Sequence, residues 1–166
     1  MRAVNGRPAV LTLTDGLPER HLEPGETLFR QGEPDHASVA VLVSGSLRIE
    51  VDGGRLPDVA VPGSFVGEVG SLLDVPRTAD VVAAAPTTVR LIGDPRAFFE
   101  SHPSLALELA RQLAGRLHRL TAYLDDVRTQ FADSEGHLTM VDAVLSRLAS
   151  RPVVEIEGGS DRSPDY

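Results

Sequence analysis

Residues 39–54 read VAVLVSGSLRIEVDGG, and this stretch decides the fold class. Apolar side chains occupy every second position in two short runs, namely Val39, Val41, Val43, Leu47, Ile49 and Val51. An alternation of period two predicts β-strands with one face in a core, and glycine-rich breaks between such runs predict turns. The stretch therefore predicts two consecutive short strands, with turns at Gly45 and at Asp52-Gly53-Gly54.

The same pattern extends in both directions, from Glu19 to Ile92. Turn signals recur at close intervals, at Pro24-Gly25, Gly32, Pro62-Gly63 and Gly93-Asp94-Pro95. This spacing favours a sandwich or barrel over an alternation of strands and helices. We expect a mainly β domain with added α-helices, in which residues 19–94 form a jelly-roll-like β-roll.

The pattern becomes helical after Pro95. Residues 97–100 predict one or two helical turns, and Ser101-His102-Pro103-Ser104 predicts the start of a long helix that ends near Phe131. Its apolar residues have the heptad spacing of a helix-to-helix seam, and they are Leu113, Leu117, Leu120, Leu124, Val127 and Phe131. The stripe extends back through Ala110 and Ala106. Such a seam either docks on its own roll or pairs with a second copy, and the repeated leucines favour a homodimer through residues 106–131.

The domain plan that follows has four parts. Residues 1–18 are an N-terminal extension, residues 19–131 form the roll and its helices (95–131), residues 132–151 contain a short helix, and residues 152–166 form a disordered tail. The short helix carries its apolar face on Leu138, Val141, Val144, Leu145 and Leu148.

Composition excludes several classes of protein. The chain has 166 residues and a formal net charge of -8, which argues against direct DNA binding because phosphate backbones would repel it. It has no cysteine, so disulfides, thiolate metal sites and cysteine nucleophiles are impossible. No apolar run reaches the ~18 residues of a membrane span, and no signal peptide is evident. We expect a cytoplasmic protein with no membrane association.

Enzyme motifs are also missing from the sequence. The five histidines, His21, His36, His102, His118 and His137, are scattered singly and form no H-x-H pair. The chain contains neither a G-x-S-x-G elbow nor a P-loop. We therefore expect no metal site, no catalytic residue and no enzymatic activity.

Residues 62–82, PGSFVGEVGSLLDVPRTADVV, carry the chemistry. A helical turn over residues 69–73, opening at Gly67-Glu68, would point backbone N–H groups at one spot and favour a phosphate there. Arg77 follows on a segment extended by Pro76, and its planar fork suits two phosphate oxygens. Glu68 offers an acceptor for a sugar hydroxyl, and Thr78 adds a hydroxyl beside the arginine.

This segment completes an ordered set of motifs. Pro24-Gly25-Glu26 comes first, then residues 28–33, Val43-Ser44-Gly45, residues 63–68 and Pro76-Arg77-Thr78-Ala79. In this order they resemble the cyclic-nucleotide-binding domain family, which includes bacterial catabolite activator proteins, protein kinase A regulatory subunits and cyclic-nucleotide-gated channels. The resemblance covers roughly residues 19–131.

The resemblance implies a ligand inside a β-roll that a helical lid closes. It assigns the cassette backbone to Gly67, Val69 and Gly70, the ribose to Glu68, and the cyclic phosphate to Arg77 and Thr78. One buried negative charge would be matched by one arginine, so ATP should bind poorly. We expect removal of Arg77 to abolish binding and to leave the roll folded.

The base is less constrained. Alignment with the catabolite activators brings two adenine-contacting positions onto Leu120 and Thr121, and Thr121 alone keeps a hydroxyl. Thr78 is compatible with adenine and with guanine. The resemblance therefore favours cAMP and leaves cGMP open.

The chain departs from the catabolite activators after the long helix. It resembles their winged helix-turn-helix domain only over residues 138–150, which leaves no room for a recognition helix. We therefore expect a stand-alone sensor that signals to an unknown partner protein through a change in its lid or dimer helix. The alternatives are a ligand-free scaffold or interaction module, and a cyclic-dinucleotide receptor.

Overall fold

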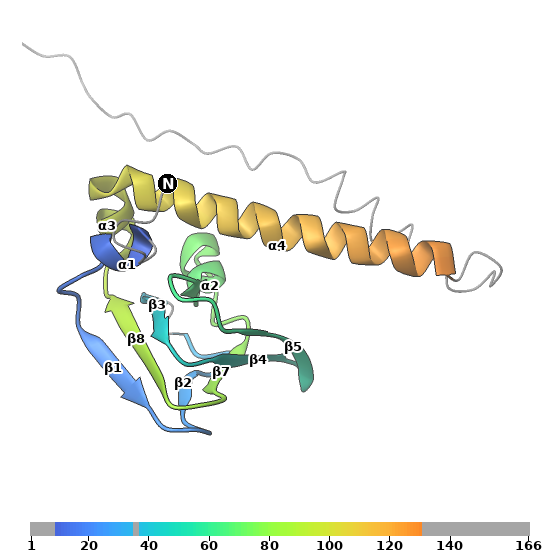
Figure 1. The fold of residues 1–166 in the computed structure, drawn as a ribbon, viewed down its shortest axis with the longest axis horizontal. Coiled ribbons are helices and arrows are strands. Elements are labelled where there is room, and N and C mark those ends of the chain that lie inside the picture. The colour runs from blue at the N-terminus through green and yellow to red at the C-terminus, as the bar shows by residue number, and fades with distance from the viewer. Residues whose placement is uncertain (1–8, 35–36, 131–166) are drawn as a thin grey trace, which may run out of the picture. The chain divides into compact units, whose positions relative to one another are not determined.

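The computed structural model describes residues 9–34 and 37–130, and its strands form a β-roll of two antiparallel four-stranded sheets (Figure 1). The first sheet has the order β1 (Glu19–Leu22), β8 (Thr87–Ile92), β3 (Val39–Ser44) and β6 (Phe65–Val66). The second has the order β2 (Thr27–Phe29), β7 (Asp80–Ala83), β4 (Leu47–Val51) and β5 (Gly54–Val59). The predicted mainly β roll, followed by helices, is confirmed.

Four helices accompany the sheets in the described ranges. The α1 helix (Ala9–Leu13) precedes the roll, and α2 (Glu68–Leu73) lies between β6 and β7. After β8 come α3 (Pro95–Ser101), which Asp94 caps through its side chain, and α4 (Pro103–Gln130). The long helix therefore begins within two residues of its predicted start, and it continues to Gln130, the last described residue before its predicted end near Phe131.

Strand β3 explains why residues 39–54 determine the fold. Val39 and Val41 point to one side and Ala40 and Leu42 to the other, and all four are 0% exposed. Each side belongs to a different core, because β3 lies inside the first sheet between β8 and β6. A strand buried on both faces needs apolar residues at successive positions, as in VAVLV.

The first core fills the interior of the roll. It combines residues from both sheets, namely Leu22, Leu28, Phe29, Ala40, Leu42, Leu47, Val66, Val81, Ala83 and Val89. The second core lies between the first sheet and the helices, and it contains Val10, Leu11, Val39, Val41, Phe65, Ile92, Leu105 and Leu109. Burial of this apolar surface is the main force holding the helices on the roll.

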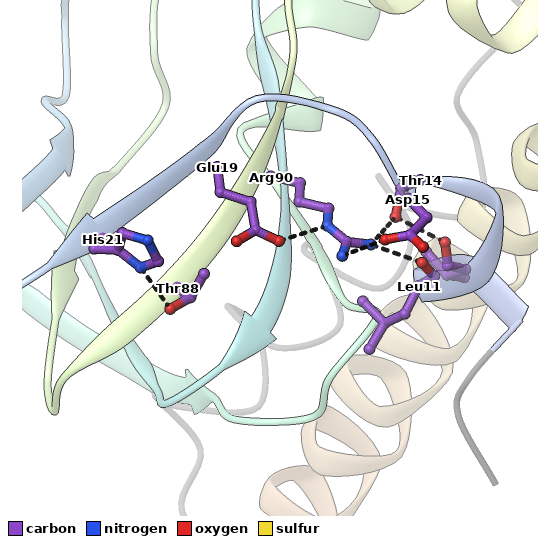
Figure 2. A network of polar contacts seen from close by, with 8 residues as sticks. Leu11, Thr14, Asp15, Glu19, His21, Thr88 and Arg90 are labelled. Carbon is purple, nitrogen blue, oxygen red and sulfur yellow. Dashed lines mark hydrogen bonds and ion pairs between the residues drawn. The ribbon is translucent and has the colours of Figure 1, made fainter.

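The N-terminal segment is part of this structure, which the sequence analysis did not predict for residues 1–18. Arg90 on β8 anchors it (Figure 2), since Nη1 donates to Leu11 O at 2.7 Å and Nη2 pairs with Asp15 at 2.8 Å. Nε of Arg90 also donates to Glu19 at 3.0 Å. Because Arg90 is only 4% exposed, these contacts tie the segment after α1 firmly to the sheet.

The chain divides into two compact units, Met1–Gly115 and Arg116–Tyr166, and α4 continues from one into the other. In the first unit α4 buries Leu105 and Leu109, with Leu113 partly buried beside them. Ala110 is exposed and Ala106 is partly buried, so neither residue of the predicted heptad stripe belongs to this core, and their place in a helix-to-helix seam stays a prediction. The larger leucines one position earlier face the core because they remove more apolar area from water.

The seam residues after Leu113 are not part of the second core. Leu117 and Leu120 are 53% and 48% exposed, and Leu124 and Val127 are half-buried. Phe131, the predicted helix within residues 132–151 and the tail at 152–166 lie outside the described residues. Among the described helices, none has the length and apolar character needed to cross a membrane.

Candidate functional site

The site is built on a sharp turn between β6 and α2. Gly67 has φ +80° and ψ 1°, a left-handed conformation that an L side chain rarely adopts. A Cβ at this position would lie 2.6 Å from Cε2 of Phe29 and 2.8 Å from Nη1 of Arg77. Both the backbone conformation and the close packing therefore require glycine, and the turn brings the backbone directly against Arg77.

Arg77 reaches this turn from the segment between α2 and β7. Its Nη1 donates to Gly67 O at 3.0 Å and to Ser38 O at 2.8 Å, and Nη2 donates to Ser38 Oγ at 3.0 Å. Its guanidinium carbon lies 3.8 Å from the centroid of the Phe29 ring, which is cation–π geometry. These contacts leave the residue 4% exposed and hold the guanidinium in one orientation.

The backbone of Arg77 is held as well. Gly32 N donates to Arg77 O at 2.8 Å, and Arg77 N donates to Glu33 O at 2.9 Å. The segment that carries Arg77 thus pairs with residues 32–33. These backbone bonds fix the point from which the guanidinium extends.

Glu68 is the first residue of α2 and is 2% exposed. Glu68 and Arg77 are therefore two ionisable residues that are buried at the same turn. A carboxylate accepts hydrogen bonds from hydroxyl groups, and a guanidinium donates to planar pairs of anionic oxygens. The corner of Gly67, Glu68 and Arg77, called the binding corner below, can therefore recognise a molecule that has both a hydroxyl and an anionic group.

The other predicted residues are more dispersed. Val69 is 36% exposed, and Gly70 is buried and accepts the Val75 N–H at 3.0 Å, which helps to end α2. Thr78 is exposed beside Arg77. Leu120 and Thr121 belong to the second compact unit, and their predicted contact with a base stays a prediction.

Two residues of the site were missed by sequence reasoning. Phe29 lies in the quoted motif of residues 28–33, but an apolar residue in a strand gives no sign that it stacks on an arginine. Ser38 precedes β3, 39 residues from Arg77 in sequence, and no local pattern links the two. The burial of Arg77 also changes one expectation: truncation to alanine would remove packing on Phe29 and would affect folding as well as binding.

Within residues 9–34 and 37–130, no group of three or more histidine, aspartate or glutamate side chains has the arrangement needed to hold a metal ion.

Comparison with known proteins gives a family match for the roll. Residues 19–100 match the model of the family described as the cyclic nucleotide-binding domain. The acetyltransferase Pat of Mycolicibacterium smegmatis is 38% identical over 96 residues, which are 55% of this chain and 28% of that protein. The chain covers 28% to 49% of the length of the first three curated relatives.

Solved structures give the same result. The catabolite activator protein of Thermus thermophilus superposes with a TM-score of 0.60 at 25% identity, over 74% of this chain and 61% of that one. A cAMP-binding acyltransferase from Mycobacterium smegmatis superposes with a TM-score of 0.54 at 32% identity, over 70% of this chain and 38% of that one. With the roll and the motif order, these matches show that residues 19–100 of the chain belong to the cyclic nucleotide-binding domain family.

Proposed function

We propose that the binding corner holds a cyclic mononucleotide, with cAMP favoured over cGMP, and that the domain acts as a regulatory sensor. The observation that carries the proposal is the burial of Glu68 and Arg77, 2% and 4% exposed, at a single glycine turn. A few polar groups that converge at one place in an otherwise apolar roll are typical of a small-molecule site.

Each group has a role in this proposal. Glu68 accepts a hydrogen bond from a ribose hydroxyl, and Arg77 donates to the cyclic phosphate. The bonds from Arg77 to Ser38 use its Nη1–Nη2 edge, so a phosphate on the Nε–Nη2 edge would leave them intact. Thr78 and the backbone of Gly67, Val69 and Gly70 complete the cassette. The additional charges of ATP would be desolvated without further cations to match them.

The preference for adenine rests on the resemblance, which gives Thr121 as a base contact, and on a relative. The Thr121 hydroxyl donates its proton to Leu117 O at 3.0 Å, which leaves the oxygen as an acceptor for an amino group. Adenine and guanine both carry such a group, so Thr121 is compatible with either base. The acyltransferase from Mycobacterium smegmatis, 32% identical, is described as cAMP-binding.

The output is proposed to pass through α4 to a partner protein. The exposed Leu117 and the half-buried Leu124 support a homodimer seam on this helix. Replacing both residues by glutamate should give monomers in sedimentation velocity, and a dimer that survives both substitutions would contradict the seam.

The proposal is tested by calorimetric titration of the refolded, nucleotide-free protein with cAMP, cGMP, 5′-AMP and ATP. We expect saturable binding of cAMP, weaker binding of cGMP and little response to the linear nucleotides. If none of the four nucleotides binds, the proposal is overturned in favour of a scaffold. If a fifth titration then shows binding of a cyclic dinucleotide, the domain is a cyclic-dinucleotide receptor instead.

A further inference from the structure

One side chain of α4 is bonded to the strand that leads into the binding corner. Gln112 Nε2 donates to Gly63 O at 2.9 Å, and Gln112 Oε1 accepts from Phe65 N at 3.1 Å. Because a backbone carbonyl only accepts and a backbone N–H only donates, these two partners also determine which way the amide is turned. The pair of bonds is called the Gln112 latch below.

The Gln112 latch occupies hydrogen-bonding positions that a further strand at the edge of the sheet would use. Strand β6 is the edge of the first sheet, and its inner side pairs with β3: Leu42 N donates to Ser64 O at 2.9 Å, and Gly63 N donates to Leu42 O at 2.7 Å. The groups at Gly63 O and Phe65 N face the other side. The amide of Gln112 offers an N–H to Gly63 O and its oxygen to Phe65 N, as a neighbouring strand would present a donor and an acceptor.

Water is poorly placed to replace the latch. Phe65 is 0% exposed and packs in the second core with Leu105 and Leu109 of α4, and Gly63 is buried. A buried backbone group that loses its partner is left without compensation for its desolvation. The latch therefore matters for the local backbone of residues 63–65, beyond the apolar packing around it.

This backbone continues directly into the site. Val66 separates Phe65 from Gly67, whose carbonyl accepts from Arg77 at 3.0 Å and whose conformation positions Glu68. The Gly67 backbone packs closely on Phe29 and Arg77, with no space for a Cβ, so a displacement of β6 would disturb the packing of the corner. The latch and the assembled corner occur together in this structure.

We propose that Gln112 is a positioning residue that holds the binding corner in its ligand-binding geometry through β6. The inference rests on the proposed function and adds to it a route from the ligand to α4. By thermodynamic linkage, a latch that favours the binding geometry is itself favoured by bound ligand, so occupancy of the corner holds the first part of α4 against the roll.

The test compares three variants of the full chain by cAMP titration. Gln112→Met keeps the length of the side chain and removes both hydrogen bonds, and Gln112→Glu keeps the acceptor but faces Gly63 O with a carboxylate. We expect cAMP affinity to fall about three- to tenfold in the first and further in the second. Arg111→Met, at a neighbouring residue whose side chain is 55% exposed, should change it less than twofold.

Amide hydrogen exchange distinguishes a positioning role of Gln112 from a purely structural one. In the wild type, saturating cAMP should slow exchange at Phe65 and across residues 105–113, and in Gln112→Met this slowing in α4 should be lost while the ligand is bound. If Gln112→Met is unfolded in circular dichroism, Gln112→Asn, one methylene shorter, replaces it in both measurements.

The outcomes separate the two proposals. A wild type that ignores cAMP overturns the proposed function. A wild type that binds cAMP, with Gln112→Met of equal affinity and equal α4 protection, overturns the role of Gln112 alone.

Discussion

Two arginines are buried to the same extent, 4% exposed, but they are held in different ways. Arg90 bonds the carboxylates of Asp15 and Glu19 and the carbonyl of Leu11, and so joins the segment after α1 to β8 and β1 (Figure 2). The contacts described for Arg77 are the carbonyls of Ser38 and Gly67, the Ser38 hydroxyl and the Phe29 ring.

The difference separates a structural arginine from a candidate ligand arginine. The partners of Arg90 belong to segments that it fastens together, so its loss should be measured mainly in the stability of the fold. Arg77 is fastened to the backbone of the binding corner itself. We therefore expect its loss to be measured in binding as well as in stability.

The largest expected effect is that of Arg77→Lys on cAMP affinity. Lysine keeps the charge but loses the planar fork that suits two phosphate oxygens, and charge-assisted bonds of this kind contribute about 1.5–3 kcal/mol each. Affinity in calorimetric titration should fall at least tenfold. The matched control is Arg90→Lys, which makes the same chemical change at the other buried arginine and should bind cAMP within threefold of wild type. Equal losses of cAMP affinity in both variants would show that Arg77 has no special role in binding.

The converse measurement is the stability of Arg90→Lys. A lysine cannot bond Leu11 O, Asp15 and Glu19 together from this position, so the free energy of unfolding should fall by about 2 kcal/mol in urea titration. Stability equal to wild type, or a smaller loss than in Arg77→Lys, would refute the role of Arg90 as the anchor of the N-terminal segment.

Gly67→Ala tests the tight turn that only one of the two arginines contacts. The left-handed conformation costs an alanine about 1 kcal/mol, and contact with Phe29 and Arg77 adds to that cost. Gly53→Ala isolates the conformational part, since Gly53 has φ +76° and nothing within 4 Å of its Cβ position. We expect Gly67→Ala to be the less stable of the two in thermal unfolding and to bind cAMP more weakly. Indistinguishable variants would show that the close packing is unimportant.

The smallest effect is expected at one of the carboxylates that hold Arg90. The side chain of Asp15 is 66% exposed, and exposed ion pairs contribute about 0–1 kcal/mol. Asp15→Asn should therefore lower the free energy of unfolding by about 0.5 kcal/mol, while Glu19 and Leu11 O continue to hold the guanidinium. A loss as large as that of Arg90→Lys would mean that the anchor depends on this single exposed partner.

Part of the fold and of the site was predictable because the signals are local. The strands follow from alternating apolar residues, and the turn at Gly45 follows from a glycine between two such runs. Gly67, Glu68 and Arg77 were singled out because their order in the segment 62–82 resembles a known family, and the structure brings them to one turn. Their roles toward a ligand stay predictions.

Other features depend on contacts between distant residues. The heptad spacing identified Leu113 but continued to Ala110 and Ala106, whereas packing on the roll selects Leu105 and Leu109. Nothing near Arg90 in sequence indicates that Asp15 is its partner, since 75 residues separate them. The same holds for Ser38 and Arg77, and for Gln112 and Phe65.

The sequence by itself determined the class of fold, a mainly β roll followed by a long helix, because periodicity and turn chemistry are properties of short segments. The resemblance singled out Gly67, Glu68 and Arg77. Only the tertiary structure decided that Arg90 fastens the N-terminal segment to the sheet, and that the amide of Gln112 bonds the edge of the first sheet. A sequence specifies which groups are charged or polar. Their partners, and hence what each one does, are set only when the chain brings distant segments within hydrogen-bond distance.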